Sequence, residues 1–264
     1  MAHLFIFGLG YSAKRIAAVA SARGWDVTAT GSSGDVDFAD RPAVQRELGR
    51  ASHVLSSVPP EGECDPVLET YGDLLRPAHW LGYLSSTGVY GDTGGAWVDE
   101  TAPTGAGRRG ARAECDAAWL ARGARVFRLP GIYGPGRSAL ERVANGKAHR
   151  IDLPGQVFSR VHVDDIAAGV AAGFDAAPGA YNLADDLPTS QNAVIEEACR
   201  LLRREPPPLV TLEQAGLSPM ARGFYAENRR VANGKAKRVL GWTPRFPSYR
   251  EGLSGLLSGM GGGT

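Results

Sequence analysis

Residues 4–13 read Leu-Phe-Ile-Phe-Gly-Leu-Gly-Tyr-Ser-Ala, and they carry the strongest structural signal in the sequence. The four apolar residues from Leu4 to Phe7 predict a short buried strand that ends at Gly8. Beyond Ala13 the apolar residues recur with a helical period, and the pattern stops at Arg23-Gly24, where a basic residue and a glycine typically end a helix. The stretch therefore predicts a strand, a glycine turn and a helix in direct succession.

The turn has the pattern Gly-x-Gly-x-x-Ala, which in this context is typical of dinucleotide binding. Its first glycine allows the sharp bend, its second lets a pyrophosphate approach the backbone, and its alanine lets the helix pack closely on the strand. The helix N-terminus would face the anion. The predicted cofactor-binding residues of the turn are Gly8, Gly10, Tyr11, Ser12 and Ala13. A glycine turn that binds nothing is the alternative.

Strand-like and helical segments alternate beyond this unit. Strands are predicted at 25–30, 52–58, 80–86 and 124–129, and helices at 111–121 and 196–204. Such alternation predicts an α/β protein with a doubly wound parallel sheet, the Rossmann fold, and a smaller C-terminal α/β lobe. We expect residues 1–175 to form the NAD(P)-binding domain and residues 176–264 the smaller lobe on the substrate side, with some chain interchange between the two.

The choice between NAD and NADP depends on the residues after the second strand. NAD-binding units carry a carboxylate there for the ribose, but this sequence has Thr30-Gly31-Ser32-Ser33. Ser32 and Ser33 could donate to a 2′-phosphate, and Lys14 and Arg15 add positive charge nearby, so NADP is weakly favoured. Neither cofactor is excluded, because these residues could also form a simple turn.

Composition narrows the class of protein. The 264 residues include 29 Lys and Arg against 28 Asp and Glu, and this balance gives no electrostatic footprint for nucleic acid. No apolar run reaches the roughly 18 residues of a membrane span, and the three cysteines and five histidines have no metal-ligand spacing. We therefore expect a cytoplasmic protein with a small-molecule partner and with no metal, no nucleic acid and no membrane. Oligomeric state is left open.

Further segments carry a family resemblance. They are Asp37-Phe38, Leu84-Ser-Ser-Thr-Gly-Val-Tyr-Gly91, Arg128-Leu-Pro-Gly-Ile-Tyr-Gly-Pro-Gly136 and Val161-His-Val-Asp-Asp-Ile-Ala167, with Tyr181-Asn-Leu183 and Ala236-Lys-Arg-Val-Leu-Gly-Trp242 beyond them. Together with the glycine turn, and in this order, they resemble the atypical extended short-chain dehydrogenase/reductases, the NAD-dependent epimerase/dehydratase-like family. The resemblance spans nearly the whole chain.

The resemblance implies roles for individual residues. Asp37 and Phe38 would contact the adenine, and the cofactor-binding set would be completed by Ser57, Val58, Pro59 and Pro130. Ser86, with Thr87 as its fallback, would orient the substrate hydroxyl. Tyr90 is the first candidate for a proton-transferring group, although in the Val-Tyr-Gly turn its ring could instead simply pack.

The usual catalytic pair of the family, Tyr-x-x-x-Lys, is missing from this sequence. None of the eight tyrosines has a lysine four residues later, and counting back from Glu114 puts Ala106 and Gly110 in the two positions. Arg108, Arg109 and Arg112 stand in the same stretch and would suit an anionic ligand, or they could simply form the solvated start of a helix. We expect an NAD(P)-binding protein that resembles sugar-nucleotide epimerases, dehydratases and reductases but has a non-standard active site. The alternative is a redox-inactive NAD(P)-binding sensor or structural protein.

Overall fold

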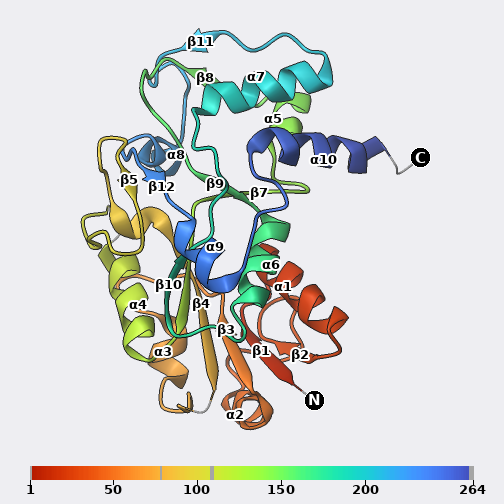
Figure 1. Cartoon of the computed structure of the whole chain (residues 1–264), viewed down its shortest axis with the longest axis vertical. Helices are drawn as coiled ribbons and strands as arrows, with labels where there is room; N and C mark the ends of the chain where they lie inside the picture. Colours follow the sequence, from red (N-terminus) through yellow and green to blue (C-terminus); the bar gives the residue numbers. More distant parts are fainter. Residues whose placement is uncertain (1, 78, 108–109, 262–264) are drawn as a thin grey trace.

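A six-stranded parallel sheet forms the centre of the molecule (Figure 1). The computed structural model describes residues 2–77, 79–107 and 110–261. The strands lie in the order β10-β6-β4-β3-β1-β2. Their bounds are β1 His3–Phe7, β2 Asp26–Ala29, β3 His53–Ser56, β4 Trp80–Ser86, β6 Arg125–Leu129 and β10 Gly179–Asn182. The predicted doubly wound α/β fold is confirmed.

Both faces of the sheet are covered by helices, and this explains why residues 4–7 of β1 are all apolar. Leu4 and Ile6 point into a core under α1 Tyr11–Ala22 and α6 Val163–Ala172. Phe5 and Phe7 point into a second core on the other face, under α2 Arg41–Arg50, α3 Pro66–Tyr71 and α4 Gly110–Ala121. Successive side chains of a strand alternate between faces, so a strand buried on both sides needs no polar residue.

The sheet has its topological switch point between β1 and β3. A single parallel bridge from Thr30 to Val36 adds a rudimentary strand outside β2. The chain therefore moves outward from β1 through β2 to this bridge, returns to the centre at β3, and moves outward in the other direction. Ligands of such sheets bind outside the carboxyl ends of the strands, at the switch point.

The second part of the molecule lies at the top of Figure 1. Its own core is formed by three helices: α5 Ala139–Ala144, α7 Gln191–Leu202 and α10 Tyr249–Gly261. The helix predicted at 196–204 begins five residues earlier, at Gln191. Ser190 caps it by accepting a hydrogen bond from Ala193 N. Short parallel pairs connect the remaining segments: β7 Gly131–Tyr133 with β9 Arg160–His162, β8 Arg150–Ile151 with β11 Leu209–Val210, and β5 Trp97–Val98 with β12 Arg230–Val231.

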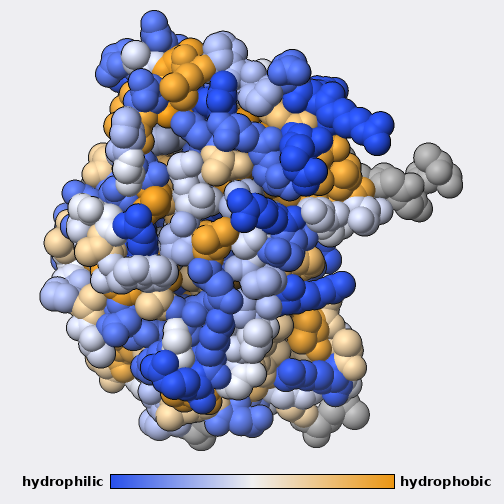
Figure 2. All heavy atoms as spheres, turned by 45° about the horizontal axis from the view of Figure 1, so that its top comes forward, coloured by the Kyte–Doolittle hydropathy of each residue, from blue (hydrophilic) through white to orange (hydrophobic). Residues whose placement is uncertain are grey.

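The remaining short elements are η1 Thr87–Tyr90, α8 Pro219–Phe224 and α9 Gly234–Leu240. On the face seen in Figure 2, apolar patches are separated by hydrophilic side chains. No helix within residues 2–77, 79–107 and 110–261 is long and apolar enough to cross a bilayer.

A buried ion pair between Arg128 and Asp116 joins three elements of the sheet domain. Arg128 donates to both carboxylate oxygens of Asp116, at 2.6 and 3.0 Å. The two residues are only 3% and 1% exposed. Ser85 donates to the same carboxylate at 2.6 Å, and Arg128 also donates to the Tyr90 hydroxyl at 3.0 Å. The pair therefore links β6, α4 and the carboxyl end of β4.

We predict that Arg128→Met lowers the free energy of unfolding by about 3–5 kcal/mol, because it leaves the Asp116 carboxylate buried without its partner. Urea unfolding followed by circular dichroism measures the change. Arg50→Met is the control, since Arg50 pairs with Asp26 through side chains that are 58% and 47% exposed. Exposed ion pairs add little, so equal losses in the two variants would contradict the prediction.

A second pair of buried charged residues lies where β9 meets the loop after β10. Arg160 donates to the carbonyl oxygens of Phe158 and Thr189, at 2.8 and 3.0 Å. Asp185 is 2% exposed, and its Oδ2 has no hydrogen-bond partner among the described residues. Burial raises the pKa of Asp185 to about 7, although the charge of Arg160 opposes this shift. Near neutral pH, Asp185 is therefore poised between its protonated and charged forms.

We predict that Asp185 makes the protein less stable as pH rises from about 4 to about 7, because the folded chain holds this proton more tightly than the unfolded chain. The contribution is complete below the unfolded pKa, near the ordinary value of 3.8, and it is lost as pH passes the folded pKa. Urea midpoints at about pH 5 and about pH 8 should show this loss in the wild type and a smaller one in Asp185→Asn. A variant with the wild-type pH profile would disprove the assignment.

Candidate functional site

The glycine turn is held by the residue that follows β2. Gly8 N donates to the Thr30 hydroxyl at 3.0 Å, and Leu9 N donates to the Thr30 carbonyl at 2.8 Å. Gly8 has φ +85°, a conformation that favours glycine. A Cβ on Gly8 would also lie 3.1 Å from Val58 Cγ2 at the end of β3. The turn is therefore fixed at the switch point, between β1, β2 and β3.

The N-terminus of α1 is open. Its N-cap is Gly10, which has no side chain to accept from the first-turn amides. A Cβ built on Gly10 would meet nothing within 4 Å. Ser12 and Ala13 are buried against the sheet. Free amides and the positive end of the helix dipole thus face open space, which is the arrangement that a pyrophosphate needs.

A hollow of about 480 Å³ continues the site beyond β2, and its lining residues are Gly31, Ser32, Gly34, Asp35, Val36, Asp37 and Phe38. Lys14 of α1 donates to the Ser33 hydroxyl at 3.1 Å and brings a positive charge to the same segment. The Asp35 carboxylate accepts from Ala29 N and the Asp37 carboxylate from Ala39 N, at 3.1 and 3.0 Å. Each of these carboxylates therefore directs one of its two oxygens to a nearby backbone amide.

The next strand ends contribute the other predicted cofactor residues. Ser57 and Val58 follow β3, with Ser57 N donating to Phe7 O at 2.8 Å, and Pro59 is exposed beside them. Pro130 follows β6 directly. All the residues predicted to bind the cofactor therefore lie at the carboxyl edge of one sheet, from the end of β2 to the end of β6.

Tyr11 connects α1 with the loop after β7. Its hydroxyl donates to Pro135 O at 3.0 Å, and the Arg137 guanidinium lies 5.0 Å from its ring centre. Burial raises the pKa of Tyr11 above its ordinary value, against the charges of Arg15 and Arg137. Its ring thus holds the loop beside the glycine turn.

The predicted catalytic residues lie at the carboxyl end of β4, in unequal surroundings. Ser86 is half-buried, and its hydroxyl accepts from Gly88 N at 3.1 Å, which caps η1. Thr87 is 4% exposed. Tyr90 is 3% exposed, and its hydroxyl donates to Asn182 Oδ1 at 2.8 Å while it accepts from Arg128. Burial raises the pKa of Tyr90, although Arg128 opposes the shift.

The loop before α4 packs directly on this turn. Gly105 N donates to Val89 O at 2.9 Å. A Cβ on Gly91 would lie 2.7 Å from the carbonyl carbon of Ala106. Ala106 therefore stands beside η1, where the resemblance puts the family's tyrosine, and Gly110 begins α4. Arg108 and Arg109 lie outside the described residues.

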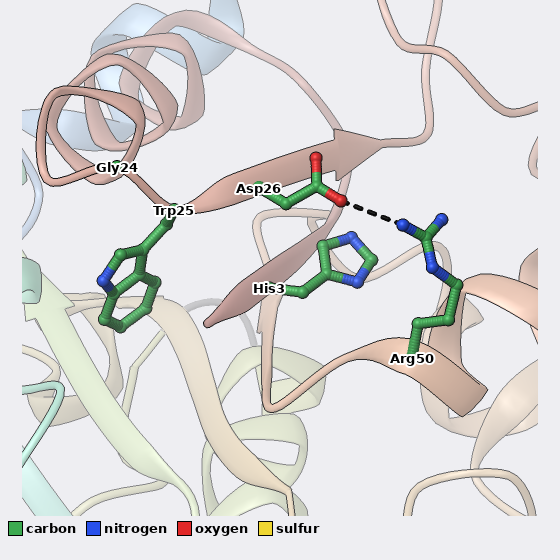
Figure 3. A pocket seen from close by; sticks show the side chains of 5 residues that line it. All are labelled: His3, Gly24, Trp25, Asp26 and Arg50. Atoms are coloured by element: carbon green, nitrogen blue, oxygen red, sulfur yellow. Dashed lines mark hydrogen bonds and ion pairs between the residues drawn. The ribbon is translucent and has the colours of Figure 1, made fainter. Parts of the chain in front are cut away.

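A second hollow, of about 490 Å³, opens at the opposite edge of the sheet, where β1 and β2 begin (Figure 3). Its lining includes His3, Trp25, Asp26 and Arg50. The charges of Asp26 and Arg50 pair at 3.0 Å, and His3 Nε2 is hydrogen-bonded with Thr28 at 2.8 Å. Ligands of parallel sheets bind at the carboxyl edge, so the glycine-turn edge is the candidate site. No cluster of metal-ligand type occurs among the described residues.

Several solved structures have a similar arrangement. A functionally unknown conserved protein from Silicibacter pomeroyi is 39% identical, with a TM-score of 0.88 over 98% of this chain and 99% of its own. The chain belongs to the same family as that protein. No family model matches the chain.

Two more distant structures define the fold further. Thermus thermophilus UDP-glucose 4-epimerase, solved with NAD, is 18% identical, with a TM-score of 0.72 over 99% of this chain and 100% of its own. Human epimerase family protein SDR39U1, solved with NADPH, is 16% identical, with a TM-score of 0.71 over 97% of this chain and 99% of its own. The fold is that of the NAD-dependent epimerase/dehydratase proteins, the extended short-chain dehydrogenase/reductases.

A curated relative from Streptomyces sp. is named 3-diazoavenalumate denitrifying reductase. It is 33% identical over 140 residues, which are 48% of this chain and 45% of that protein. The aligned part thus spans less than half of the curated relative's length.

Three residues at this edge make contacts that were not predicted from the sequence. They are Thr30, which holds Gly8, Tyr11 as a tether to Pro135, and Arg229, which donates to Gly91 O at 2.7 Å. Thr30 has a local signal, because it stands directly after β2. Tyr11 and Arg229 act on residues more than a hundred positions away, and a single sequence holds no signal for such pairs.

Proposed function

We propose that this chain binds a nicotinamide dinucleotide at the glycine-turn edge and acts as an NAD(P)-dependent reductase or epimerase-like enzyme with a non-standard active site. The observation that carries the proposal is the open N-terminus of α1. Gly10 leaves its amides without a side-chain cap and leaves the space above them free. The residues that would hold the cofactor are those of the turn, the hollow beyond β2, and the ends of β3 and β6.

The bound cofactor would donate or accept a hydride, and the chain itself must bind and orient the substrate. We assign that role to Ser86, because its half-buried hydroxyl stands at the end of the central strand β4. It accepts one hydrogen bond from Gly88 N, so its own proton stays available to a substrate oxygen. Thr87 and Tyr90 are more deeply buried beside it. Of these three, Ser86 is best exposed to a substrate.

This site lacks the residues that usually transfer the proton in the family. No Tyr-x-x-x-Lys pair occurs in the sequence, and Ala106 offers only a methyl group at the tyrosine position. A positioned proton donor typically contributes roughly 10²–10⁴-fold to the rate. This observation favours a second candidate function, a protein that binds NAD(P) without turnover.

We predict that Gly10→Val abolishes NADPH binding while it leaves the fold intact. The valine side chain would fill the space above the α1 amides, and nothing within 4 Å would clash with its Cβ. Calorimetric titration measures binding, and circular dichroism checks the fold. Gly49→Val is the matched control, because a Cβ on Gly49 of α2 also meets nothing within 4 Å. A folded Gly10→Val variant with wild-type affinity would refute the proposed site.

One further measurement on the wild type distinguishes the two candidate functions. Oxidation of bound NADPH, followed by its absorbance with a panel of carbonyl and sugar-nucleotide substrates, identifies an enzyme. An epimerase restores its cofactor in every cycle, so conversion of the substrate is also followed by chromatography of the products. Tight binding with neither a change of absorbance nor any product identifies the non-catalytic alternative. Ser86→Ala then tests the assigned residue, since turnover that survives it would place the active centre elsewhere.

We also propose that NADPH binds at least as tightly as NADH, because Lys14 and Ser33 lie where a 2′-phosphate would be received. Lys14→Met is predicted to weaken NADPH binding about fivefold and to leave NADH binding unchanged, as for an exposed charged contact of about 1 kcal/mol. Parallel titrations with both cofactors measure the ratio. Equal losses for the two would assign Lys14 to the shared pyrophosphate instead.

A further inference from the structure

The carboxyl end of β4 is flanked by an arginine from the C-terminal part of the chain. Arg229 lies next to β12, and its Nη1 donates to Gly91 O at 2.7 Å and pairs with Glu227 at 2.8 Å. The Arg229 side chain is only 16% exposed. Two fixed contacts on one nitrogen set the plane of the guanidinium. Among the described residues, neither its Nη2 nor its Nε makes a hydrogen bond.

Gly88 separates this guanidinium from Ser86. A Cβ built on Gly88 would lie 3.3 Å from Ser86 Oγ and 4.0 Å from Arg229 Nη2. The distance between Ser86 Oγ and Arg229 Nη2 therefore cannot exceed the sum of these two distances. Gly88 has no positive φ, so the backbone does not require a glycine at this position. What its missing side chain provides is room between two hydrogen-bond donors.

We propose that Arg229 and Ser86 form an anion subsite that anchors a carboxylate or phosphate group of the substrate across Gly88. A guanidinium edge and a hydroxyl present several donors, which suit two oxygens of one anionic group. The inference rests on the proposed function, because it places substrate beside Ser86. It adds the chemical class of the group that is recognised and the residue that recognises it.

A purely structural role for Arg229 makes a different prediction. The contacts with Gly91 and Glu227 use Nη1 alone, and they would hold the C-terminal segment against η1 without any ligand. In that case Gly88→Ala would have no effect on anion binding, because it touches neither contact. The two explanations therefore predict different anion affinities for a Gly88 variant as well as for an Arg229 variant.

The test is calorimetric titration of the NADPH-saturated protein with oxalate, with inorganic phosphate, and with oxamide as the neutral counterpart of oxalate. We expect one of the anions to bind and oxamide not to bind. Arg229→Met and Gly88→Ala should each weaken that binding about tenfold, with partial recovery in Arg229→Lys. Arg46→Met, which removes an exposed charge from α2, is the control and should not change it.

Three results would overturn the inference: no binding of either anion to the wild type, wild-type anion affinity in folded Arg229→Met, or wild-type anion affinity in Gly88→Ala. If Arg229→Met does not fold, Gly88→Ala decides alone. NADPH affinity is measured separately in each variant. If NADPH does not bind at all, the proposed function fails, and the same anion titrations without cofactor still decide the subsite.

Discussion

The buried Arg128–Asp116 pair is the constraint on which the candidate site depends. It lies behind the carboxyl ends of β4 and β6, and its hydrogen bonds run through Tyr90 to Asn182 at the end of β10. The Asn182 backbone amide in turn donates to Glu100 at 2.7 Å. Because a buried charge must keep its partner, these strand ends cannot shift independently. The turn from Ser86 to Tyr90 is therefore held on its inner side by a polar network rather than by apolar packing alone.

The same network changes the interpretation of Tyr90. The sequence made this tyrosine a candidate for proton transfer, because it follows Ser86 at the end of a central strand. In the fold its hydroxyl already has one acceptor and one charged donor, and burial raises its pKa. Its catalytic role stays a prediction that only kinetics can test. The hydrogen bond from Tyr90 to Asn182 also connects η1, which follows β4, with the end of β10.

Sequence reasoning worked where a short stretch of chain carries its own structural signal. The apolar run from Leu4 to Phe7, the glycine turn and the α1 pattern are all local, and they suffice to predict a parallel sheet and its switch point. Helix α7 was predicted too short, because its capping residue Ser190 lies outside the amphipathic pattern at 196–204. The contacts of Tyr90 with Asn182 and of Tyr11 with Pro135 join positions that are about a hundred residues apart. No periodicity or spacing in one sequence encodes such pairs.

In the proposed function, the residues at the end of β4 would have to recognise a substrate without the Tyr-Lys pair. In the family that the sequence resembles, the lysine brings a positive charge to the reacting end of the cofactor. Here Ala106 and Gly110 bring none. Among the described residues, Arg128 lies behind the turn but is paired with Asp116, whereas Arg229, from the other part of the chain, lies across Gly88 from Ser86. A guanidinium stays charged at any physiological pH and does not give up its proton readily. It can therefore hold an anionic group but cannot replace tyrosine as an acid. In the proposed function, Arg229 and Ser86 would supply donors for an anionic group, and the proton that accompanies hydride transfer would have to come from a group other than Arg229.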